Sequence, residues 1–201
     1  MPTVEHSTLT AANLHEPKGA DTATEGQVYI ADGVGSGAWT DWPFGWGYYK
    51  DNAGTQVKTT TPSLLSIDGA GTTTEETHLP PSLRGVGSLW DTTNDKITPM
   101  LTGDSYEIRL DLPITAESGS PTELTIELDI AGSNYASKTT IVEHYAVTGK
   151  STPYTISIGF PIFCGTTFKT NGGQFWVYTD TGTATITNPA ITLVRTSSGG
   201  I

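Results

Sequence analysis

The sequence predicts an all-β protein whose carboxyl-terminal part is a sandwich of about eight strands. Residues 106–114 and 123–131 alternate apolar and polar side chains, which is the pattern of a strand with one buried face. Strand-like segments follow one another about every ten residues and are separated by turn signals. The 23 glycines, 12 prolines and 15% charged residues also suit turn-rich β structure better than a helical bundle.

The first predicted strand is Gln27-Val-Tyr-Ile-Ala31, within an otherwise polar amino-terminal region. The glycines at positions 33, 35 and 37 then favour a turn, because glycine adopts conformations that other residues avoid. These glycines also loosely match a phosphate-binding loop. No helix is predicted after them to hold a phosphate, so a hairpin or loop is the preferred interpretation.

The remaining predicted strands begin at residue 89. Alternation and turn chemistry place them at 89–90 with 96–97, 106–114, 123–131, 138–147, 154–163, 174–179, 183–187 and 190–196. About eight strands with this spacing are typical of a jelly roll. Strands 138–147 and 174–179 carry substantial residues on both faces, which fits either an oligomer core or a deeply buried central strand.

Composition and the predicted strands divide the chain into three regions. They are an extended arm at 1–40, an aromatic and Thr/Gly-rich connecting region at 41–87, and the jelly roll at 88–201.

Composition argues against several classes of function. The formal charge of -11 disfavours nucleic-acid binding, which needs clustered Lys and Arg. The amino terminus lacks the basic and apolar regions of a signal peptide, and no apolar run approaches the roughly 20 residues that cross a bilayer. Cys164, the single cysteine, lies among apolar neighbours and is expected to be a buried structural thiol. We expect a protein made in the cytoplasm that binds neither nucleic acid nor membrane.

No pattern of catalytic or metal-binding residues stands out. The four histidines are scattered without a ligand pair, and no Gly-x-Ser-x-Gly motif is present. The segment Asp91-Thr-Thr-Asn-Asp95 could bind calcium, but such clusters more often initiate a β-turn. We therefore expect a non-enzymatic protein without a metal site or cofactor.

Six aromatic side chains gather between residues 39 and 49. Packing or an interface is the preferred interpretation, because aromatic rings are enriched at the buried centres of interfaces. A platform for sugar rings is the alternative. The residues predicted to form an interface or a trimer core are Trp39, Trp42, Phe44, Trp46 and Tyr48.

The amino-terminal part resembles a module of tailed-bacteriophage virion proteins. The segment Asn13-Leu-His-Glu-Pro-Lys-Gly-Ala-Asp-Thr-Ala23, followed by Gly26-Gln-Val-Tyr-Ile-Ala-Asp-Gly-Val-Gly-Ser-Gly-Ala-Trp39, is similar to stretches of head fibres, capsid decoration proteins and some tail fibres. It covers about the first fifth of the chain. The resemblance implies that the arm binds the major capsid protein. The arm residues expected to make this contact are His15, Glu16, Pro17, Lys18 and Gly19.

The carboxyl-terminal part is similar to trimeric jelly rolls of the tumour-necrosis-factor-like type. This stretch opens with Leu89-Trp-Asp-Thr-Thr-Asn-Asp-Lys-Ile-Thr-Pro99 and closes with Ile186-Thr-Asn-Pro-Ala-Ile-Thr-Leu-Val-Arg195. Such domains form knobs on phage fibres and decoration proteins. The resemblance implies a homotrimer with its arms on the particle, and the lack of a recognisable shaft implies a short knob.

Three hypotheses about function follow. The leading one is a phage virion protein, a capsid decoration (cement) protein or short head fibre, which is assembled in the host cytoplasm and stabilises the shell from the capsid surface. The alternative is a receptor- or glycan-binding module of a tail fibre or baseplate, with Trp176 and Tyr178 as candidate contacts to a host surface glycan. The third is a cellular trimeric β-sandwich without a viral role, against which the arm resemblance argues.

Overall fold

The computed structural model describes residues 23–24, 26–31, 37–42, 44–67, 73–119, 121, 123–136, 140–146 and 152–199. The chain divides into two units, Met1–Trp42 and Pro43–Ile201, and each is a separate compact body. The described residues form fifteen strands and one short helix. This composition agrees with the predicted all-β class.

The described part of the first unit is a β-hairpin. Strand β1 (Gln27–Ala31) pairs antiparallel with β2 (Gly37–Asp41), and Tyr29 lies opposite Trp39. The two rings meet edge to face with centroids 5.5 Å apart. An added Cβ at Gly37 would collide with the Ile30 carbonyl, so this position requires glycine. The predicted strand and hairpin are thus confirmed.

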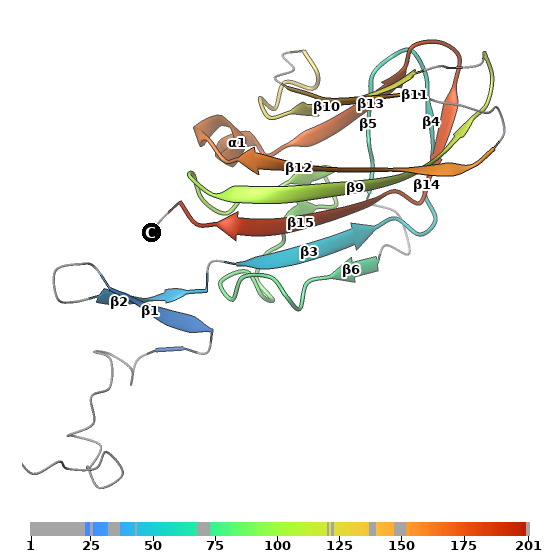
Figure 1. Ribbon diagram of the computed structural model, residues 1–201. Coiled ribbons are helices and arrows are strands. Elements are labelled where there is room, and N and C mark those ends of the chain that lie inside the picture. The colour runs from blue at the N-terminus through green and yellow to red at the C-terminus, as the bar shows by residue number, and fades with distance from the viewer. Residues whose placement is uncertain are drawn as a thin grey trace, which may run out of the picture. The chain divides into compact units, whose positions relative to one another are not determined.

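The second unit is a jelly roll of two antiparallel sheets that face each other (Figure 1). Its eight principal strands are β3 (Gly45–Lys50), β5 (Ser63–Leu64), β9 (Ser105–Ala116), β10 (Glu123–Asp129), β11 (Thr140–Ala146), β12 (Tyr154–Phe163), β13 (Gln174–Thr179) and β15 (Ala190–Ser197). The larger sheet contains the order β3-β15-β9-β12, and the smaller sheet has the order β5-β13-β10-β11. The first principal strand therefore pairs with the eighth and the second with the seventh, which is the nested pairing of a jelly roll. The predicted fold is confirmed.

Shorter elements complete the unit. The larger sheet gains β4 (Thr55–Lys58), β6 (Thr73–Glu75) and β14 (Ala184–Thr187), which bring it to seven strands. Strands β7 (Trp90–Asp91) and β8 (Lys96–Ile97) form a small hairpin beside the smaller sheet, joined to it by the bridge between Ile97 and Gly173. Helix α1 (Thr166–Asn171) precedes β13.

The predicted connecting region at 41–87 is corrected by the strand pairing. Its segments β3, β4, β5 and β6 are all built into the two sheets, and the second unit begins at Pro43 rather than at residue 88. Tyr49, Leu65 and Ile67 from this region are fully buried in the core. By contrast, each strand predicted from residue 89 onward is present within a few residues of its expected bounds.

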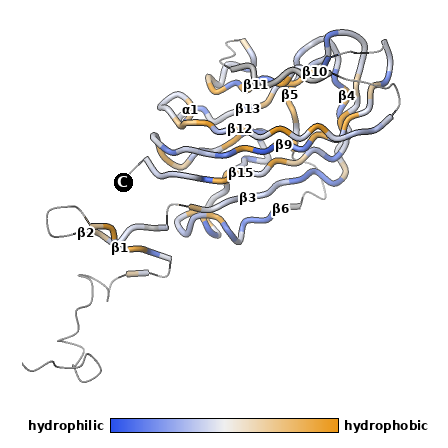
Figure 2. Tube along the Cα trace, in the orientation of Figure 1, coloured by the Kyte–Doolittle hydropathy of each residue, from blue (hydrophilic) through white to orange (hydrophobic). Residues whose placement is uncertain are grey.

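The core lies between the two sheets. Its inward residues on β9 and β10 are at most 1% exposed: Tyr106, Ile108, Leu110, Leu112, Ile114, Leu124, Ile126 and Leu128. Figure 2 shows hydrophobic and hydrophilic residues interspersed along the strands, as this one-sided burial requires. Burying one such aliphatic side chain stabilises the fold by about 1.5–3 kcal/mol relative to leaving it exposed.

Candidate assembly and ligand-binding surfaces

The outer face of the larger sheet carries two of the aromatic residues predicted for an interface. Trp46 and Tyr48 alternate along β3 with the buried Tyr49, and Trp46 lies opposite Val194 of β15. At the end of β12 the Phe163 side chain is 65% exposed. Trp46 and Tyr48 on β3 are separated from Phe163 on β12 by β15 and β9, so these rings are spread over the face rather than gathered in one patch.

Hydrogen bonds on the inner side fix the orientation of β3. The Tyr49 hydroxyl donates to Glu76 Oε1 at 2.7 Å and accepts from the Leu89 backbone N–H at 3.1 Å. Burial raises the pKa of Tyr49, because it disfavours the charged phenolate. On the opposite side of the strand, the Trp46 ring stacks on the His78 imidazole with centroids 4.8 Å apart. Trp46 and Tyr48 are therefore directed to the outer face.

The five aromatic residues predicted for an interface divide between the two units. Trp39 and Trp42 belong to the first unit, and the other three belong to the second. Trp39 packs against Tyr29, whereas Trp42 and Phe44 are 48% and 43% exposed. Their interface role stays a prediction. The capsid-binding role also stays a prediction for the arm residues His15, Glu16, Pro17, Lys18 and Gly19, which lie outside the described residues.

The outer face of the smaller sheet is covered by the chain itself. Its outward residues on β10 are only 3%, 1% and 1% exposed: Thr125, Glu127 and Asp129. Tyr135, from the loop after β10, packs over β13 with ring centroids 5.4 Å from Trp176 and 6.4 Å from Tyr178. Sequence alternation could not show this cover, because it depends on a loop that folds back over its own strand.

The two candidate glycan contacts lie beneath this cover. The Tyr178 hydroxyl donates to Glu127 Oε1 at 3.2 Å. The Trp176 Nε1 atom is buried and meets no acceptor among the described residues. Both rings are half-buried, and Tyr135 packs against them. Their contact with a glycan stays a prediction.

A buried ion pair joins the last strand to the start of β9. Asp104 Oδ1 accepts from Arg195 Nη2 at 2.7 Å, and Oδ2 accepts from Arg195 Nε at 3.0 Å. The Tyr106 hydroxyl and the Gly199 N–H also donate to this carboxylate. Desolvation raises the pKa of Asp104, but hydrogen bonds from Arg195, Gly199, Tyr106 and Leu101 outweigh it and the pKa is lowered. The network stabilises the fold and offers no open site for a ligand.

Two further buried groups have shifted pKa values. Lys58 on β4 donates to the Leu64 carbonyl at 2.7 Å and to Ser63 Oγ at 3.2 Å, and burial lowers its pKa to about 8. Burial raises the pKa of the Cys164 thiol to about 11, and the side chain is fully enclosed. The predicted structural thiol is confirmed as buried.

The segment at 91–95 forms the predicted turn. Asp91 Oδ1 accepts from the backbone N–H groups of Thr93 and Asn94 at 2.9 and 3.1 Å. Within the described ranges, no three His, Cys, Asp or Glu side chains are grouped so that they could hold a metal ion. In the same part of the chain, no helix has the length and apolar character needed to span a membrane.

No protein-family model and no curated protein matches the chain. Among solved structures, it is similar to the Eiger TNF of S. frugiperda, with 11% identity, a TM-score of 0.48, and coverage of 80% of this chain and 97% of that one. It is also similar to the PRD1 vertex protein P5, with 11% identity, a TM-score of 0.44, and coverage of 87% and 84%. A carbohydrate-binding module of Cellvibrio mixtus lichenase 5A in complex with cellotriose has 13% identity, a TM-score of 0.29, and coverage of 87% and 89%. At these identities and TM-scores, the similarities do not support an inference about function.

Proposed function

We propose that this chain is a non-enzymatic structural protein of a bacteriophage virion, either a capsid decoration (cement) protein or a short head fibre. The observation that carries the proposal is the division into an amino-terminal unit and a separate jelly roll. A decoration protein needs one segment for attachment and one domain for display, and this organisation supplies both. The resemblance of residues 13–39 to virion modules supports the same assignment.

The proposed assembly is a homotrimer whose jelly rolls meet through the outer face of the larger sheet. Trp46, Tyr48 and the exposed Phe163 on this face support the choice, because aromatic side chains are favoured at interface centres. Three arms attached to one trimer act together on the capsid. Once the first arm is bound, the others bind at high effective concentration, so weak single contacts suffice.

Co-sedimentation with empty phage capsids tests the attachment. The arm variant combines His15→Ala, Glu16→Ala and Lys18→Ala, and the control combines Glu117→Ala and Lys169→Ala on the exposed jelly-roll surface. We expect the arm variant to stay in the supernatant while the control sediments like the wild type. Sedimentation of the arm variant at the wild-type level would contradict attachment through these residues.

A further inference from the structure

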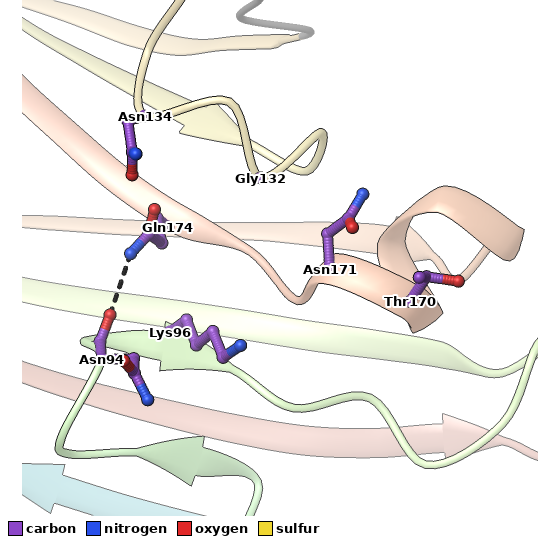
Figure 3. A pocket seen from close by; sticks show the side chains of 7 residues that line it. All are labelled: Asn94, Lys96, Gly132, Asn134, Thr170, Asn171 and Gln174. Carbon is purple, nitrogen blue, oxygen red and sulfur yellow. Dashed lines mark hydrogen bonds between the residues drawn. The ribbon is translucent and has the colours of Figure 1, made fainter.

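A polar pocket lies where three distant segments of the jelly roll meet (Figure 3). Asn94 and Lys96 come from the β7–β8 hairpin, Asn134 comes from the loop after β10, and Asn171 and Gln174 come from the end of α1 and the start of β13. The cavity has a volume of about 290 Å³. This volume is near the lower end of the range for small-molecule sites.

One wall of the pocket is a strained loop held by Asp129. This carboxylate accepts from the backbone N–H groups of Ala131, Ser133 and Tyr135 at 2.8, 3.1 and 3.2 Å. Asn134 and Tyr135 have φ angles of 50° and 72°. Such angles cost roughly 1–3 kcal/mol per residue outside glycine and persist only where the surroundings enforce them, often at ligand sites. The loop therefore holds Asn134 in place at the pocket.

The opposite walls are also held by hydrogen bonds. The Asn94 side-chain amide donates to the Asp91 carboxylate at 2.7 Å, and Gln174 Nε2 donates to the Asn94 carbonyl at 2.9 Å (Figure 3). Asn171 Nδ2 donates to the Ile130 carbonyl at 3.4 Å. Side chains that are positioned before binding lose less entropy when a ligand arrives.

The chemistry of the lining indicates the class of ligand. Its side chains are four amides, one hydroxyl and one ammonium: Asn94, Asn134, Asn171, Gln174, Thr170 and Lys96. An amide presents both an acceptor oxygen and a donor nitrogen, and a hydroxyl group on a ligand also donates and accepts. Among the described residues, no carboxylate and no apolar side chain lines the pocket. The lining therefore fits a ligand rich in hydroxyl groups.

Two lysines, Lys96 and Lys169, lie in this region, and Lys96 also interacts with the nearby Asp91 carboxylate. A second pocket of about 120 Å³ shares Lys96, Thr170 and Asn171 with the first and is also lined by Lys169. The two adjacent pockets together are called the groove; Lys96 lines both of them, and Lys169 lines the second. Ammonium groups attract an anionic group on a ligand, and a hydrogen bond to a charged partner is stronger than one between neutral groups.

From this chemistry we propose that the groove binds an acidic saccharide, whose hydroxyl groups contact the amides and whose carboxylate contacts Lys96. This function goes beyond the virion role and does not rest on it. Trp176 and Tyr178 do not line the groove, and Tyr135 packs against both rings, so the saccharide lies apart from them.

Saturation-transfer difference NMR on the full chain tests the proposal with glucuronate and galacturonate as probes, compared with glucose and acetate. We expect saturation transfer to the uronates, less to glucose and none to acetate. Asn134→Ala should weaken uronate binding about tenfold, since a hydrogen-bonding amide on the loop held by Asp129 is lost. Lys96→Gln should reduce uronate binding to the level of glucose. The matched controls, Asn52→Ala and Lys50→Gln, should bind like the wild type.

Three results would overturn the proposal. The first is the absence of saturation transfer to either uronate at millimolar concentration. The second is uronate binding that survives both Asn134→Ala and Lys96→Gln, which would place the sugar elsewhere. The third is acetate binding as strong as uronate binding, which would show a site for any small anion.

Discussion

Strands β9 and β10 have the same alternation in sequence but differ in what surrounds their outward residues. On β9, Arg109 is exposed and pairs with Asp111 along the surface at 3.0 Å. On β10, Glu127 and Asp129 are each 1% exposed: the loop that carries Tyr135 donates to Asp129, and Tyr178 of β13 donates to Glu127. Alternation thus decides which residues face the core, whereas other elements of the chain decide whether the outer face is covered.

We propose different roles for the outer faces of the two sheets. The outer face of the larger sheet carries the half-buried Trp46 and Tyr48, and we propose this face as the subunit contact. The smaller sheet has an outer face covered by its own loop, and the same loop forms a wall of the polar pocket. Changes at matched positions on the two faces should therefore have different effects.

The largest effect is expected at Asp104, which anchors the start of β9. Asp104→Asn leaves the Arg195 guanidinium buried at 4% exposure without its charge partner. Breaking a buried pair in this way should reduce the free energy of unfolding by roughly 3–5 kcal/mol. Urea unfolding at pH 7 measures this loss, and a loss below about 1 kcal/mol would contradict it.

The same carboxyl group predicts an acid dependence. Its folded-state pKa is lowered, so its contribution is fully present above the unfolded-state value of about 4 and is lost as the pH falls through the folded-state value. The stability difference between the wild type and Asp104→Asn should therefore shrink as the solution is acidified below about pH 4.

Asp129→Ala and Asp111→Ala compare the two outer faces directly. Asp129→Ala removes a buried acceptor of three backbone hydrogen bonds and should cost roughly 3 kcal/mol. Asp111→Ala removes a surface ion pair and should cost less than about 1 kcal/mol. Chemical denaturation of the two variants gives both values. Equal losses of unfolding free energy in the two variants would show that the loop does not cover β10.

Trp176→Ala and Trp46→Ala extend the comparison to aromatic residues. Trp176→Ala removes the ring beneath Tyr135 and should cost roughly 2–3 kcal/mol in thermal or chemical unfolding. Trp46→Ala should instead weaken self-association, because its ring lies on the outer face that we propose as the subunit contact. A Trp176→Ala variant as stable as the wild type would indicate that the cover over the smaller sheet is loose.

The smallest expected effect is on the pH dependence of stability. It concerns Lys58, a basic residue on an inner face. Its folded-state pKa of about 8 lies below the unfolded-state value, so the native state binds fewer protons above pH 8 and stability rises with pH. Between pH 8 and 9 the wild type should gain about 1 kcal/mol relative to Lys58→Met. Cys164 titrates in both proteins, so its contribution cancels. If the stabilities of the wild type and Lys58→Met changed equally between pH 8 and 9, the pKa of Lys58 would not be lowered.

The sequence predicts those strands whose alternation of apolar and polar residues extends over enough consecutive positions. Strands 154–163 and 174–179 agree with the structure at both ends, because each has enough residues to establish its pattern between clear turns. Strand β3 was not predicted because glycines and aromatic residues on both faces obscure its alternation. Helix α1 has only six residues, which is too short for a helical period.

The candidate pocket could not be predicted from the sequence. Its lining residues are separated by up to eighty positions, as in the hydrogen bond from Gln174 to the Asn94 carbonyl. Nor does a local pattern indicate that Asp129 would hold Tyr135 over Trp176, since that contact needs the loop and β13 together. The pocket is a product of tertiary packing.

Sedimentation equilibrium is the sharpest test of whether the outer face of the larger sheet is a subunit contact. The full chain and a Trp46→Arg variant are measured under the same conditions. We predict a wild-type mass of three times the 21.3 kDa chain and a variant that dissociates toward the mass of one chain. A wild type with the mass of one chain, or a Trp46→Arg variant that remains trimeric, would show that this face is not the trimer contact.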